Sequence, residues 1–261
     1  MDLSIAQFGI VSNMFSFTIA TMGASALFFY LSRSSVAPKY RSALMVSGLV
    51  VSIACYHYFR IYQSWHEAYA LSGDIFKATA ITFNDAYRYA DWILTVPLLM
   101  VELIAVLALP KAQGNSLLTR LVIAAALMIG LGYPGEVSGE STTRWLFWGL
   151  SMVPFVYILF TLFTELTSSL STQPEAVRSL VSLARTVLLV TWAFYPIAYA
   201  IITVTGTKSA TGQVALQVGY TIADITSKAG YGMLIYFMAR TKSEVEGYNP
   251  DAATTGKFAT A

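Results

Sequence analysis

Seven apolar stretches limit what this chain can fold into. Each holds about 20 residues, which is enough for a helix to cross the hydrocarbon core of a bilayer. They lie near residues 8–31, 41–65, 84–109, 116–133, 143–167, 180–205 and 212–239. Only 11% of the 261 residues are charged, whereas soluble domains carry roughly 25%. We therefore expect an all-α integral membrane protein, a bundle of seven transmembrane helices that forms one domain over residues 1–261.

The distribution of Lys and Arg predicts how this bundle is oriented, because cytoplasmic connections carry the excess of these residues. One set of helix ends carries Arg33, Lys39, Arg41, Lys111, Arg120, Arg178, Arg185, Arg240, Lys242 and Lys257. The other set carries Lys77, Arg144 and Lys208, with Arg60 and Arg88 near helix ends. We therefore expect the N-terminus outside the cell and the C-terminus in the cytoplasm, with residues 241–261 as a mobile tail. No basic residue precedes Arg33, so the first segment is expected to be retained as a helix and not cleaved as a signal peptide.

Lys228 is the residue whose burial should cost the most free energy, because its charged amine lies near the middle of the last apolar segment. It stands in ADITSKAGYG, over residues 223–232. Asp224 precedes it by four residues, which places both on one helix face, about 6 Å apart along the axis. A structural ion pair is one explanation, but such a pair is rarely the most stable way to fill a core. A lysine in an apolar site is also suited to forming a Schiff base with an aldehyde, which explains more of the pattern.

The third segment, RYADWILTVPLLMVE, gathers polar side chains on one face. Arg88, Asp91, Thr95 and Glu102 fall within roughly 60° of one direction at about 100° per residue. Asp91 and Glu102 are about 16 Å apart along the axis, too far for a hydrolytic pair of carboxyl groups. We expect Arg88 to keep Asp91 ionised and apolar neighbours to keep Glu102 protonated. A group between them that loses a proton to Asp91 and regains one from Glu102 would move protons out of the cell.

Aromatic residues indicate what kind of molecule carries the group that exchanges protons with Asp91 and Glu102. Trp92 follows Asp91, and the sixth segment contains TWAFYP, with Trp192, Tyr195 and Pro196. Aromatic residues in membrane helices more often face lipid or the interface, and a proline can simply kink its helix. Together with Lys228, however, they indicate a pocket for an elongated apolar aldehyde.

The motifs RYADWxLTxPLL, WxxYP and DxxxK resemble those of the microbial rhodopsins, and the match runs over about residues 8–240. The resemblance implies all-trans retinal bound to Lys228 as a protonated Schiff base, with Asp91 and Asp224 as counter-ions and Arg88 completing the charge balance. The retinal pocket it implies contains Trp92, Thr95, Leu99, Trp192, Tyr195 and Pro196. Asp91, Thr95 and Glu102 match the triplet of the proteorhodopsin-like outward proton pumps, which implies Asp91 as proton acceptor and Glu102 as proton donor. Leu99 matches the green-absorbing form of the family.

Three further stretches, ACYHYFRIYQSW, FNDAYRYADW and GYPGEVS, look like the xanthorhodopsin branch, which includes Gloeobacter rhodopsin. This resemblance implies a hydrogen bond from His57 to Asp91, where the residues alone favour a core histidine. It also implies a carotenoid antenna at Gly149, although a small residue for close helix packing is an equal explanation. The sixth-to-seventh loop, VTGTKSATGQ, has no carboxylate, so the paired glutamates that release protons in haloarchaeal pumps are not expected. Only Glu136 and Glu140 could contribute.

The leading hypothesis is a light-driven outward proton pump, a transporter and not an enzyme, in a bacterial plasma membrane. Its expected cofactors are retinal and a carotenoid, its partners are lipids and protons, and no metal or nucleic acid is expected. The resemblance implies a homo-oligomer such as a pentamer. A photosensor that signals to a partner protein is the alternative, against which the carboxyl donor Glu102 argues. A sodium pump would carry Asn, Asp and Gln at the triplet, a chloride pump would lack the acceptor aspartate, and a non-retinal receptor leaves Lys228 and Asp224 unexplained.

Overall fold

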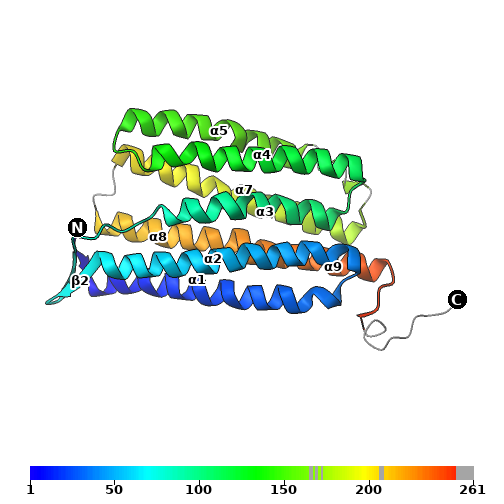
Figure 1. Cartoon of the computed structure of the whole chain (residues 1–261), viewed down its shortest axis with the longest axis horizontal. Helices are drawn as coiled ribbons and strands as arrows, with labels where there is room; N and C mark the ends of the chain where they lie inside the picture. The colour runs from blue at the N-terminus through cyan, green and yellow to red at the C-terminus, as the bar shows by residue number, and fades with distance from the viewer. Residues whose placement is uncertain (165–166, 168–169, 172, 206–208, 251–261) are drawn as a thin grey trace.

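The protein, seen in a computed structural model, is a bundle of helices that lie side by side along one axis (Figure 1). The structure describes residues 1–250 except 165–166, 168–169, 172 and 206–208. The described helices of the first six apolar segments are α1 (Ile5–Ser32), α2 (Arg41–Ala68), α3 (Tyr87–Leu107), α4 (Lys111–Glu136), α5 (Ser141–Phe163) and α7 (Glu175–Thr205). Residue 1 and the last described residues lie at opposite ends of the bundle (Figure 1). All six are long and apolar enough to cross a membrane, which confirms the expected fold class.

The last apolar segment is built differently from the others. It consists of α8 (Ala210–Ile225), one π-helical turn η3 (Thr226–Gly230) and α9 (Tyr231–Val245). The three run on as one rod (Figure 1). The apolar pattern predicts the rod as a whole, but it does not predict the π turn, which depends on hydrogen bonds five residues apart and is frequent at functional sites.

A small antiparallel sheet closes the end of the bundle where the chain begins. β2 (Tyr69–Ser72) and β3 (Ile75–Ala78) form a hairpin, and β1 (Leu3–Ser4) pairs with the other edge of β3. Gly73 turns the hairpin with a φ of 65°, a conformation that glycine adopts without strain. Phe76 stacks on Phe8 with ring centroids 3.8 Å apart, so the sheet is packed onto α1. These strands were not expected from the sequence, because they are too short to show an alternating pattern.

α3 lies at the centre of the bundle. In the most apolar 18-residue stretch of α3, 61% of the residues are buried, against 28% in that of α1. It packs between α2 and α4 and also touches α9. Polar side chains on α3 are therefore enclosed by other helices and not by lipid.

Several helix ends differ from the expected bounds. α5 ends at Phe163, four residues before the expected end at 167, and α7 begins at Glu175, immediately after Pro174, instead of at 180. Of the expected tail, residues 241–245 belong to α9, and Tyr248 accepts a hydrogen bond from Arg41 at 3.0 Å. Lys208 and residues 251–261 lie outside the described residues.

Candidate functional site

Lys228 lies within the π turn η3 and is 2% exposed. Its Nζ is 2.5 Å from Oδ1 of Asp224 and 3.0 Å from Oδ2 of Asp91. The two carboxylates come from different helices, α8 and α3. One buried amine is therefore placed between two buried carboxylates, as the sequence patterns predict.

The two carboxylates differ sharply in their hydrogen bonding. Asp224 accepts hydrogen bonds from the hydroxyls of Tyr58 and Tyr195, each at 2.7 Å, and from the Trp92 indole at 3.3 Å. Neither carboxylate oxygen of Asp91 accepts a hydrogen bond from a described residue. Oδ2 of Asp91 forms an ion pair with Nζ of Lys228 at 3.0 Å. Asp224 is thus held in place on several sides, whereas Asp91 is restrained by charge alone.

His57 lies beside Asp91 but is not hydrogen-bonded to it here. Its Nδ1 is 3.8 Å from Oδ1 of Asp91 and 3.0 Å from the carbonyl oxygen of Ile53. The hydroxyl of Thr95 donates to the backbone carbonyl of Asp91 at 3.0 Å. The predicted partners of Asp91 therefore surround it, and the distance between His57 and Asp91 is about 1 Å longer than a hydrogen bond.

Arg88 has different partners from those expected. We expected it to stabilise Asp91, yet its Nε donates to Oδ1 of Asp85 at 2.8 Å, and one terminal nitrogen lies 3.7 Å from Asp224. Another terminal nitrogen donates to Gln217 at 2.5 Å. The side chain extends toward the start of α3, so Lys228 is the cation that faces Asp91.

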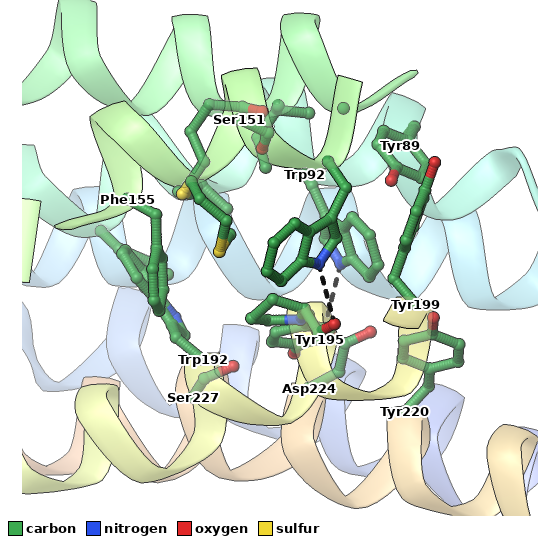
Figure 2. Close-up of a pocket in the computed structure, with 18 of the residues that line it drawn as sticks. Tyr89, Trp92, Ser151, Phe155, Trp192, Tyr195, Tyr199, Tyr220, Asp224 and Ser227 are labelled. Carbon is green, nitrogen blue, oxygen red and sulfur yellow. Dashed lines mark hydrogen bonds between the residues drawn. The ribbon is translucent and has the colours of Figure 1, made fainter. Parts of the chain in front are cut away.

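An apolar cavity with aromatic walls opens beside Lys228. Figure 2 shows Phe155 and Trp192 near one end and Tyr199 and Tyr220 near the other. The residues predicted for the pocket that line it are Trp92, Leu99, Trp192, Tyr195 and Pro196. Among the described lining residues, Lys228 has the only amine. The remaining predicted pocket residue, Thr95, is fully buried one turn from Asp91 and does not line the cavity.

Glu102 occupies a separate buried site on the same helix. It is 0% exposed, and Oε2 accepts a short hydrogen bond from the Ser47 hydroxyl of α2. Its other oxygen has no partner among the described residues. Since about 16 Å of helix separates Glu102 from Asp91, the two carboxyl groups cannot exchange a proton directly.

A second, more polar cavity lies at the end of the bundle where the chain begins. Asp85, Glu136 and Arg144 line it, and Arg144 lies 3.8 Å from Glu136. Glu136 had been expected to contribute to this mouth, but Asp85 had not. The second expected glutamate, Glu140, is not among the lining residues.

Gly149 lies on α5, next to Trp148, which lines the aromatic cavity. A Cβ atom built on Gly149 would meet nothing within 4 Å. The surface around it is apolar and exposed, with Leu146 58% and Val153 70% exposed. Close helix packing, the alternative explanation for this glycine, is not observed in the described structure.

Several residues that shape the site were not predicted from the sequence. Tyr58, Gln217 and Ser47 each form a hydrogen bond with an ionisable side chain, but their sequence neighbourhoods resemble those of other half-polar helix positions. Of these three residues, only Tyr58 could have been suspected from the sequence, because it directly follows His57, which was predicted to belong to the site. Hydrogen bonds between helices depend on how each helix is turned about its own axis. The apolar pattern of the sequence predicts this orientation only approximately.

Comparisons with known proteins agree with this geometry. A family described as bacteriorhodopsin-like protein matches residues 10–242. Green-light absorbing proteorhodopsin of a gamma-proteobacterium is 31% identical over 93% of this chain and 90% of its own length. Bacteriorhodopsin of Halobacterium salinarum is 30% identical over 89% and 85%. The crystal structure of xanthorhodopsin, a light-driven ion pump with a dual chromophore, superposes with a TM-score of 0.92 at 54% identity, covering 95% of this chain and 99% of that one.

Proposed function

Since the chain belongs to the bacteriorhodopsin-like family, we propose that it is a light-driven outward proton pump that uses retinal. It acts as an ion transporter in a bacterial plasma membrane, surrounded by lipid. The observation that carries the proposal is the position of Lys228 between two unlike carboxylates, with a third carboxyl group buried further along α3. A proton pump needs a proton acceptor, a proton donor and, between them, a group whose proton affinity changes.

The cavity beside Lys228 fits retinal. Its walls are aromatic and apolar, which suits a conjugated hydrocarbon, and its one lysine offers an amine to an aldehyde. Asp91 and Asp224 balance the positive charge on that nitrogen. Bound to the Lys228 nitrogen, retinal supplies light absorption and an isomerisation that changes the proton affinity of that nitrogen.

The hydrogen bonds favour Asp91 over Asp224 as the proton acceptor. Protonating Asp224 would weaken the bonds donated by Tyr58, Tyr195 and Trp92, each worth roughly 1–3 kcal/mol to a charged acceptor. Protonating Asp91 sacrifices no such bond. Asp91 is therefore the acceptor, and Asp224 remains the fixed counter-ion. His57 lies 3.8 Å from Asp91, close enough to interact with the charge on that carboxylate.

Glu102 returns a proton to Lys228 from the other side. It is enclosed by apolar residues and bonded to Ser47, with no described cation beside it. Arg88 lies between Asp224 and Asp85 and leads toward the polar cavity that Glu136 lines. This cavity is the exit for protons, with the N-terminus outside the cell.

Leu99 lines the retinal cavity and sets green absorption, as in the green-absorbing members of the family.

The proposal extends to a carotenoid antenna and to an oligomer. Xanthorhodopsin has a dual chromophore, and the open apolar surface at Gly149 suits a second, elongated apolar pigment. We further propose a homo-oligomer such as a pentamer, which the family resemblance favours.

The pH of an unbuffered suspension of cells that express the protein with added retinal tests the main proposal. Green light should acidify the medium, and a protonophore should abolish the change. Asp91→Asn should remove the signal while the cells keep their colour, and Lys228→Ala should give colourless cells. Coloured cells without any pH change would contradict pumping and favour a photosensor.

A further inference from the structure

A buried tyrosine near the proton donor has no role in the mechanism so far. Tyr231 begins α9, three residues after Lys228, and is 0% exposed. Its hydroxyl has no hydrogen-bond partner among the described residues. Buried hydroxyls are nearly always bonded to protein or to ordered water, so this group needs an explanation.

Glu102 has the matching deficiency. Its Oε2 is occupied by Ser47, but Oε1 is buried and without a described partner. The Tyr231 hydroxyl lies close enough to Glu102 to interact with it electrostatically. Two buried oxygens, one on α3 and one on α9, thus lie within electrostatic range of each other, and neither has a hydrogen-bond partner among the described residues.

The packing of α9 explains why they meet. A Cβ atom on Gly232 would lie 3.4 Å from Cβ of Ser47 and would clash with the Phe29 ring. α9 therefore approaches α2 closely at the residue after Tyr231. Because Ser47 also holds Glu102, the helices α2, α3 and α9 converge at the donor.

We propose that Tyr231 is a positioning residue of the donor site, whose hydroxyl and Oε1 of Glu102 hold one shared water molecule on the way to Lys228. A buried water needs two to four polar partners, and these two atoms supply two. The inference rests on the proposed function of Glu102. In the transfer, the O–H bond of Glu102 breaks and an N–H bond forms on Lys228. The water gives up one proton for each that it receives, so Tyr231 and the water end unchanged.

The test follows the return of the proton to Lys228 after a flash, by visible absorbance, in the full chain with retinal in lipid vesicles. Tyr231→Phe should slow this return about five- to tenfold, the effect of one lost hydrogen bond, and leave the colour and the arrival of the proton on Asp91 unchanged. Infrared difference spectra should show the Glu102 carbonyl stretch at higher frequency. Tyr236→Phe, on the same helix but packed against Phe28, is the matched control and should change neither.

A double-mutant cycle separates the possible roles. In a Glu102→Gln background, Tyr231→Phe should have no further effect if both act through the same water. An equal slowing with and without Glu102, or an unchanged rate and frequency in Tyr231→Phe, would overturn the inference. If Glu102→Gln itself does not slow the return, the donor assignment fails instead. Should Tyr231→Phe not fold, a water O–H band that shifts in H2¹⁸O and is lost in Glu102→Gln supports the inference, and its absence overturns it.

Discussion

Lys228 and its two carboxylates form a buried cluster in which each charge depends on the others. Taking charges out of water costs several kcal/mol per ion, and removing one member of a buried pair typically costs about 3–5 kcal/mol. The cluster is thus more important for placing an amine and its counter-ions than for stabilising the bundle.

In the protein expressed without retinal, Lys228→Ala should therefore lower the free energy of unfolding by about 3 kcal/mol, because no cation then lies between Asp91 and Asp224. Adding Asp91→Asn should recover much of the loss. Thermal denaturation followed by circular dichroism measures both. If the double variant is no more stable than Lys228→Ala, repulsion between the carboxylates is not the cause.

Gly149 is a single position at which a large side chain should block one function and spare the other. Gly149→Trp fills the open apolar surface, so carotenoid binding and energy transfer to retinal should be lost while proton pumping under green light remains. Fluorescence or action spectra with added carotenoid measure the transfer. Gly130→Trp on α4, which also has open space around it, is the control. Equal transfer in both variants would place the antenna elsewhere.

At the scale of elements, the sequence predicts the helices because each must hide about 20 residues of backbone from lipid. Regular helical spacing places Asp91 correctly relative to Glu102, and Asp224 relative to Lys228, whereas the position of Lys228 beside Asp91 was expected only from the family resemblance. The sequence does not predict the π turn at Lys228 or the hairpin at Gly73, because both are too short to alter the apolar pattern. The partners of Arg88 depend on contacts between helices, which that pattern does not encode.

The end of α3 depends on another helix. Nζ of Lys242, on α9, donates to the carbonyls of Val106 and Leu107 at 3.1 and 2.7 Å and to Gln173 at 2.8 Å. The carbonyls at a helix C-terminus lack partners within the helix, and a cation there is favourable. Lys242 therefore fastens α9, which follows directly after Lys228, to α3, which carries Glu102.

Lys242→Met should destabilise the bundle by about 1–3 kcal/mol, since it removes the ammonium donor from two buried carbonyls. Amide hydrogen exchange should accelerate at the end of α3. Lys39→Met, which removes an exposed ion pair with Glu246, should have little effect. A similar change in both variants would show that Lys242 acts only through surface charge.

For the whole molecule, orientation in the membrane is the property on which direction of transport depends. In a Cys55→Ser background, a cysteine at Asp74 reports the hairpin end, and one at Ala112 reports the opposite end; both positions are exposed. A membrane-impermeant thiol reagent should label Asp74→Cys in intact cells and Ala112→Cys only after lysis. The reverse pattern would put the N-terminus inside and reverse the proposed direction of transport.

The length of α3 between Asp91 and Glu102 has an electrical consequence. The two carboxyl groups are about 16 Å apart in a hydrocarbon core of about 30 Å, so a proton passing between their levels crosses about half of the membrane voltage. A unit charge needs roughly 2.3 kcal/mol per 100 mV for the full crossing, and hence about 1.2 kcal/mol for this part. That is enough to slow a step roughly eightfold. Each exported proton makes the inside of the cell more negative and the next proton harder to export. The rate of pumping should therefore fall as the membrane voltage rises.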